Sequence, residues 1–161
     1  MHTPSRSERK GTELFAEAAE RLHRERDLRY EIITGVTHDY IMASKRKASI
    51  FFDQAGRELP RDGGKLIGWY GNSALEAAVF GVPVVAHLSD VALERAETAG
   101  HRVQVINTDP TASGLYRVLG SFFDRDPSER HELASYTRSW IEGYHSYHST
   151  AAKLSALYDQ L

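Results

Sequence analysis

The segment from Gly68 to Val85, GWYGNSALEAAVFGVPVV, restricts the possible folds of this chain more than any other stretch. It begins with a turn in which Gly68 and Gly71 allow a tight backbone bend and a close approach to a ligand. The small and apolar residues that follow, ALEAAVF, predict a short helix packed closely against a sheet, and Gly81 is suited to end it. The next run, VPVVA, predicts a strand buried on both faces, as in parallel sheets.

The rest of the chain continues this alternation of strands and helices. Strands are expected at 28–35, 48–53, 82–87 and 102–106. The expected N-cap residues of the helices are Thr12, Thr37, Ser89 or Asp90, Asp109 and Asp126. The last helix should carry an apolar stripe of Leu154, Leu157, Tyr158 and Leu161, after a break near 143–149. Short connections between strand and helix are typical of α/β folds, so we predict a mostly parallel sheet with helices on both faces, in one domain over residues 1–161.

Length and composition fit an ordinary globular domain. The 161 residues suffice for one hydrophobic core and are too few to predict two domains. A net charge of −2 gives no general attraction to nucleic acid or to an anionic membrane, so a phosphate site would have to be local. The absence of cysteine excludes disulfides and thiolate metal ligands and fits a cytoplasmic protein. No apolar run approaches the ~18 residues of a membrane span.

The start of the helix after Gly71 is the first candidate functional site. Free N–H groups and the positive end of the helix dipole favour an anion such as a diphosphate. Glu76 stands three residues after Ser73 and would lie beside the same ligand. The same residues also form a capping box, in which Glu76 only accepts a hydrogen bond from the Ser73 N–H. Spacing alone leaves both interpretations open.

Three further positions carry polar groups with two interpretations each. A basic cluster of Arg6, Arg9 and Lys10 precedes Gly11, and composition alone describes it as a solvated terminal tail. Asp53 ends a predicted strand and is interpreted as structural rather than catalytic. His145 and His148 are spaced to share a helical face, but a zinc site needs a third protein ligand, so no metal site is predicted.

The motifs together resemble the donor-binding domain of GT-B glycosyltransferases of the retaining group 1, family 4-like type, which includes sucrose synthase and bacterial mannosyltransferases. In that family a glycine-containing turn leads into an LEA helix, then Gly-x-Pro and a Val-rich strand. Leu75-Glu76-Ala77 and Gly81-Val82-Pro83-Val84-Val85 match this pattern in order and spacing, and Lys10-Gly11 matches a Lys-Gly after the family's first strand. The resemblance covers residues 2–161 and is sharpest at 48–86.

This resemblance implies a Rossmann-like domain, the C-terminal half of a GT-B enzyme, that binds a nucleotide diphosphate sugar. The implied reaction is retaining sugar transfer with no cofactor and no obligatory metal. The groups implied to bind the donor diphosphate are Arg6, Arg9, Lys10 and the N–H groups of Gly71, Asn72 and Ser73. Glu76 is implied to accept hydrogen bonds from the donor ribose. His87, at the end of strand 82–87, either contacts the donor sugar or bonds to backbone.

Two departures from the family limit the expected activity. The family carries another Glu eight positions before the helix Glu, in contact with the donor sugar, and this position is Gly68. The acceptor-binding N-terminal domain is missing from this sequence, and residues 2–5 match only the end of the family's first strand. We therefore expect donor binding without transfer by this chain alone, and assign no catalytic residue. The alternative is a non-catalytic nucleotide-binding or protein-interaction module, which would expose no apolar docking patch.

Overall fold

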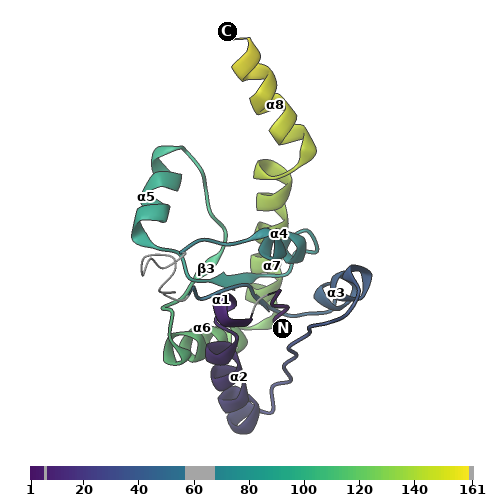
Figure 1. Ribbon diagram of the computed structural model, residues 1–161, viewed down its shortest axis with the longest axis vertical. Coiled ribbons are helices and arrows are strands. Elements are labelled where there is room, and N and C mark those ends of the chain that lie inside the picture. The colour runs from purple at the N-terminus through teal and green to yellow at the C-terminus, as the bar shows by residue number, and fades with distance from the viewer. Residues whose placement is uncertain (6, 57–67, 160–161) are drawn as a thin grey trace.

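A computed structural model describes residues 1–5, 7–56 and 68–159 of the chain. Three short parallel strands form its centre, β1 (Phe51–Phe52), β2 (Val84–Ala86) and β3 (Ile106–Asn107), which lie side by side in that order (Figure 1). His2 extends the sheet beside β1 through parallel bridges to Phe52 on one side and Ile32 on the other. The lateral order is therefore Ile32, His2, β1, β2, β3.

Helices connect these strands and cover both faces of the sheet. They are α1 (Ser7–Lys10), α2 (Thr12–Arg26), α3 (His38–Lys45), α4 (Asn72–Ala78), α5 (Asp90–Thr98), α6 (Ala112–Asp124), α7 (Pro127–Tyr144) and α8 (Tyr147–Tyr158). The predicted α/β fold with a parallel sheet is confirmed, but the sheet is smaller than predicted. The expected strand at 28–35 forms one bridge, at Ile32, because this segment lies at the sheet edge with most of its residues exposed.

The two faces of the sheet carry separate cores, because successive strand residues point in opposite directions. One core contains Phe52, Val85 and apolar residues of α2 and α6. The other contains Phe51, Val84, Ala86 and apolar residues of α4 and α7. Burial on both sides explains why the strands appear in the sequence as continuous apolar runs.

Most helix starts follow the capping residues in the sequence. Side-chain bonds to the backbone confirm three predicted N-caps: Thr37, Ser89 and Asp126. The prediction was wrong at Thr12, whose hydroxyl bonds to the ring of His2 while the preceding glycine takes the N-cap position of α2. It was also wrong at Asp109, because the Thr111 hydroxyl accepts the capping bond of α6.

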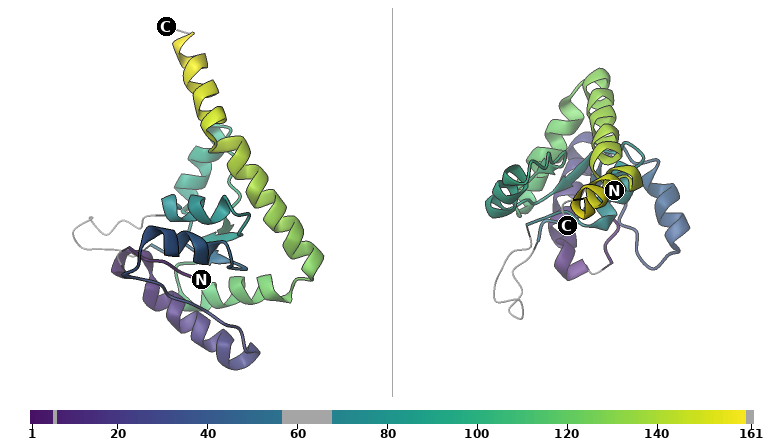
Figure 2. Two further views of the ribbon diagram at one scale, coloured as in Figure 1. Left: turned by 90° about the vertical axis from the view of Figure 1, so that its right-hand side faces the viewer. Right: turned by 90° about the horizontal axis from the view of Figure 1, so that it is seen from above.

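The last helix, α8, extends away from the rest of the molecule, as two further views show (Figure 2). None of its described residues is buried, and the predicted apolar stripe of Leu154, Leu157 and Tyr158 is exposed. The remaining stripe residue, Leu161, lies outside the described residues. The predicted break before this helix is confirmed between α7 and α8. Among the helices described here, none is long and apolar enough to cross a membrane.

Candidate functional site

The strand order creates a switch point between His2 and β1. From His2 the chain passes through α2 to Ile32 on one side, and from there through α3 to β1 on the other side. Connections that leave in opposite directions open a crevice at the carboxyl ends of the strands, where open α/β sheets bind ligands. The residues that directly follow His2 and β1, Thr3 and Asp53, therefore mark the expected site.

A cavity of about 560 Å³ lies at this end of the sheet. It is bordered by the segment after His2, by α1, by α3 and by the start of α4. Four of the residues implied by the sequence resemblance line it: Lys10, Asn72, Ser73 and Glu76. The structure thus brings these four residues together at the carboxyl ends of the strands.

Asp53 is buried directly after β1 and is held by two donors. Its Oδ1 accepts from Lys10 Nζ at 2.9 Å, and its Oδ2 accepts from the Gly71 N–H at 2.6 Å. A Cβ at position 71 would lie 3.3 Å from Lys10 Nζ, so any larger residue there would require the ammonium to shift by a few tenths of an ångström. Asp53 therefore ties α1 to the turn before α4, which supports its structural interpretation. The same contact corrects the prediction at Gly71, whose N–H is already donated to Asp53.

The site contains a cation that the sequence analysis missed, Lys45 at the end of α3. Its side chain is fully buried, and Nζ donates to the Ser73 carbonyl at 3.1 Å, to Ser73 Oγ at 2.7 Å and to Glu76 Oε2 at 2.6 Å. The ammonium also lies 4.8 Å from the centre of the Phe51 ring. No motif in the sequence points to Lys45, and the structure places it one helical turn after Ile41, which also borders the cavity.

Lys45 also replaces the predicted capping box. Ser73 and Glu76 both bond to its ammonium, and α4 has no side-chain hydrogen bond at its N-cap. The Ser73 hydroxyl also lies 3.2 Å from Oγ1 of Thr3, another residue that lines the cavity. The carboxylate of Glu76 is therefore fixed by a cation from another helix and not by its own backbone.

Two ion pairs, Lys10–Asp53 and Lys45–Glu76, set the electrostatics of the cavity. An ammonium has three donors, and within the described residues Asp53 takes one of those of Lys10, whose side chain is 17% exposed. Glu76 is 33% exposed, and in the same part of the chain only its Oε2 has a hydrogen-bond partner. The site thus presents donors for an anion and an acceptor for hydroxyl groups side by side.

Three other positions that the sequence singled out, Arg9, His87 and Gly68, are not among the residues that line this cavity. Arg6 lies outside the described residues, and Arg9 is half-buried on α1. His87 Nδ1 donates to the Thr108 carbonyl at 2.9 Å, which supports the backbone alternative for this residue. At Gly68, a Cβ would meet Ser89 Cβ and N at 2.5 Å. The family's first acidic residue therefore does not fit this backbone.

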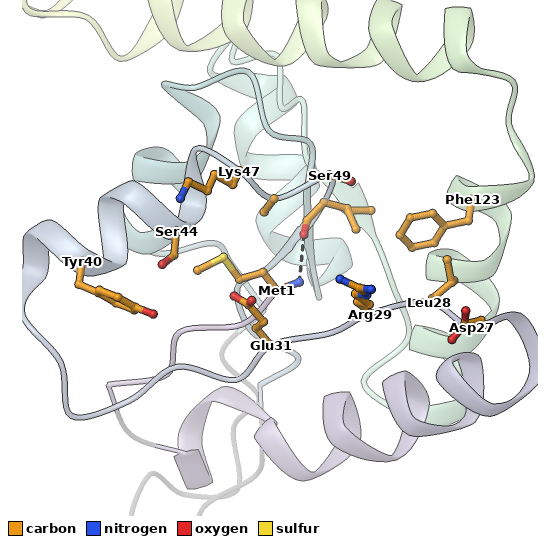
Figure 3. Close-up of a pocket in the computed structure, with 12 residues that line it drawn as sticks. Met1, Asp27, Leu28, Arg29, Glu31, Tyr40, Ser44, Lys47, Ser49 and Phe123 are labelled. Carbon is orange, nitrogen blue, oxygen red and sulfur yellow. Dashed lines mark hydrogen bonds between the residues drawn. The ribbon is translucent and has the colours of Figure 1, made fainter.

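A second cavity, of about 570 Å³, lies at the opposite, amino end of the sheet (Figure 3). It is lined by residues that directly precede the strand positions, including Met1, Glu31 and Ile50, and by Arg29 and Lys47. Figure 3 shows side chains of both charge signs around it, and the Met1 ammonium donates to the Ile50 carbonyl at 3.1 Å. The two cavities are similar in size, so position decides between them. Ligands of open α/β sheets bind at the carboxyl end, which favours the Lys10–Glu76 cavity.

Histidines form no metal site in the parts of the chain that the structure describes. No group of three or more His, Asp or Glu side chains there is arranged to hold a metal. His145 lies instead in an aromatic cluster between α7 and α8, with Nε2 at 3.4 Å from the Tyr70 hydroxyl. Burial, and to a lesser degree the nearby His101 and Lys153, lower the pKa of its imidazole.

No protein-family model matches the sequence, and no similar curated protein was found. The chain is therefore not assigned to a family, and the function proposed below is supported by the geometry of the cavity and by the sequence resemblance.

Proposed function

We propose that this chain is a Rossmann-like donor-binding domain of a glycosyltransferase, which binds a nucleotide diphosphate sugar in the Lys10–Glu76 cavity. The observation that carries the proposal is the placement of the Lys10 ammonium and the Glu76 carboxylate around one cavity at the switch point of the sheet. A cation and a carboxylate that line one cavity suit the two ends of a nucleoside diphosphate, its phosphates and its ribose hydroxyls.

The diphosphate would lie near Lys10 and the N–H groups of Asn72 and Ser73, which have no backbone acceptor among the described residues. Arg6 and Arg9 are proposed as additional phosphate ligands, and the sequence resemblance is the sole support for them. A charge-assisted hydrogen bond contributes ~1.5–3 kcal/mol, whereas immobilising the ligand costs several kcal/mol. Lys10 stays paired with Asp53, which weakens its attraction for an anion. We therefore expect an affinity nearer millimolar than nanomolar, without added metal.

Binding without transfer is proposed for this chain by itself. Gly68 stands where the resembling enzymes have a sugar-contacting acid, and the backbone there leaves no space for a side chain. The exposed stripe of Leu154, Leu157 and Tyr158 on α8 supports a further domain or partner chain over a self-contained module.

Calorimetry tests the proposal with two ligands. One is whichever of UDP and GDP binds more tightly, and the other is inorganic pyrophosphate. Glu76→Gln should weaken nucleotide binding about tenfold and leave pyrophosphate binding unchanged, because only the nucleotide has a ribose. Lys10→Met should weaken both. Lys47→Met, a lysine change in the other cavity, is the matched control and should weaken neither.

Lys10→Met leaves the buried Asp53 carboxylate without its cation, so its effect needs a second variant. The double variant Lys10→Met/Asp53→Asn removes both charges and keeps an oxygen that accepts from the Gly71 N–H. It should bind pyrophosphate as weakly as Lys10→Met. Equal losses for both ligands in Glu76→Gln, or no binding by the unaltered chain, would contradict the proposal.

A further inference from the structure

We propose that Lys45 is a positioning residue of this site, which holds the Glu76 carboxylate and the Ser73 hydroxyl in place for the nucleotide without contacting it. The inference rests on the proposed function, in which Glu76 accepts hydrogen bonds from the ribose. It adds a residue from a different helix, α3, that the sequence pattern did not point to.

The contacts of Lys45 exclude a direct role in binding. An ammonium has three donors, and those of Lys45 are directed to the Ser73 carbonyl, Ser73 Oγ and Glu76 Oε2, at 2.6 to 3.1 Å. The lysine side chain is 0% exposed, whereas that of Glu76 is 33% exposed. Lys45 also borders the cavity, but its ammonium is enclosed by Ser73 and Glu76, so the more exposed Glu76 is the group that meets the ligand.

Burial removes the hydration of the Lys45 ammonium, which is costly for a charged group. An ion pair with a buried partner is often no more stable than apolar residues of the same size. Phe51 lies against Lys45, and a methionine would fill the same space without loss of hydration. The contribution of the ammonium is therefore orientation: it fixes Oε2 of Glu76 and leaves Oε1 to accept from a ligand.

Lys45 also affects the orientation of the neighbouring Ser73 hydroxyl. Lys45 Nζ donates to Ser73 Oγ, so the proton of this hydroxyl points away from the ammonium. Thr3 Oγ1 lies 3.2 Å from Ser73 Oγ, and either hydroxyl can donate in this pair. One buried cation thus sets the direction of two groups that line the cavity.

The test compares the nucleoside diphosphate with a dideoxy analogue that lacks both ribose hydroxyls. The unaltered chain should prefer the complete nucleotide about tenfold, from one charge-assisted pair of hydrogen bonds. Lys45→Met should reduce this preference to near one while pyrophosphate binding changes less than about twofold. Adding Glu76→Gln to Lys45→Met should cause no further loss of preference, because both changes remove the same interaction. Lys47→Met, two residues further on, is the control and should keep the preference.

Each outcome is decisive. If Lys45→Met keeps the preference that Glu76→Gln loses, Lys45 does not position Glu76 and the inference is wrong. If the unaltered chain shows no preference, the proposed ribose contact itself is wrong and the inference falls with it. An NMR measurement of the Lys45 ammonium in the unaltered chain needs no variant: its signal should shift with the nucleotide and not with the dideoxy analogue. An unchanged signal with both would overturn the inference.

Discussion

Acidification from pH 7 to pH 5 should destabilise this protein through His2, which lies between Ile32 and β1 in the extended sheet. The ring is fully buried, with its centroid 4.9 Å from that of Phe52 and 5.3 Å from that of Phe15. Nδ1 donates to the Phe52 carbonyl at 2.9 Å, so Nε2 accepts from the Thr12 hydroxyl, also at 2.9 Å. A proton on Nε2 would reverse the second bond, with the ring donating to Thr12 Oγ1, and would place a charge in the core.

The magnitude follows from the pKa of this imidazole. Burial lowers it from 6.5 to about 4 in the folded protein. Because the folded-state pKa lies below the unfolded value, the contribution of His2 to stability is complete above pH 6.5 and is lost as the pH falls toward 4. The difference of 2.5 between the two values, at about 1.4 kcal/mol for each pKa unit, sets a limit of roughly 3.5 kcal/mol. Of this, about 2 kcal/mol should be lost between pH 7 and pH 5.

Urea unfolding of the unaltered chain and of His2→Phe at several pH values checks this result. The variant is expected to be less stable at neutral pH, since it lacks both hydrogen bonds, but it has no imidazole to protonate. The free-energy difference between the two proteins should therefore shrink by about 2 kcal/mol from pH 7 to pH 5. Burial also lowers the pKa of the Met1 ammonium, to about 6, but this group is common to both proteins and cancels. Parallel pH profiles would refute the reasoning.

Two further predictions concern the backbone. Gly68→Ala should destabilise the fold by about 1–3 kcal/mol, because its Cβ would overlap Ser89. Gly143→Ala in α7, with open space around the new Cβ, should stabilise the fold by about 0.5–1 kcal/mol. Thermal unfolding compares the two variants, and equal effects would contradict the close contact at Gly68. Thr111→Ala removes the N-cap of α6 and should lower the free energy of unfolding by about 1 kcal/mol. Asp109→Ala breaks an exposed ion pair and should lower it by less. The reverse order in urea unfolding would restore Asp109 as the cap.

The sequence predicted those parts of the fold that depend on local patterns. The apolar runs around Phe52 and Val85 are strands because each residue is buried on one side or the other of a covered sheet. The segment 28–35 has similar composition but lies at the edge, where it pairs on one side through Ile32. The difference depends on lateral position in the sheet, which strand composition does not encode.

The candidate site was predicted only in part, because some of its residues belong to local motifs and others meet only through the packing of the fold. Lys10, Ser73 and Glu76 belong to recognisable motifs, and the sheet topology brings them to one end. The hydrogen bonds of Asp53 and Lys45 join residues 18 to 43 positions apart. Such pairs depend on how helices pack and not on sequence spacing, so the sequence did not reveal that Lys45 holds Glu76.

The central claim is that the cavity at the carboxyl end of the sheet binds a nucleoside diphosphate, and a heteronuclear NMR titration tests it most directly. Addition of the stronger-binding of UDP and GDP, without metal, should shift the backbone signals of Thr3, Lys10, Ser73 and Glu76. The signals of Arg29 and Lys47, at the other cavity, should stay unchanged. Shifts confined to the Arg29–Lys47 end, or no shifts at millimolar nucleotide, would contradict the account.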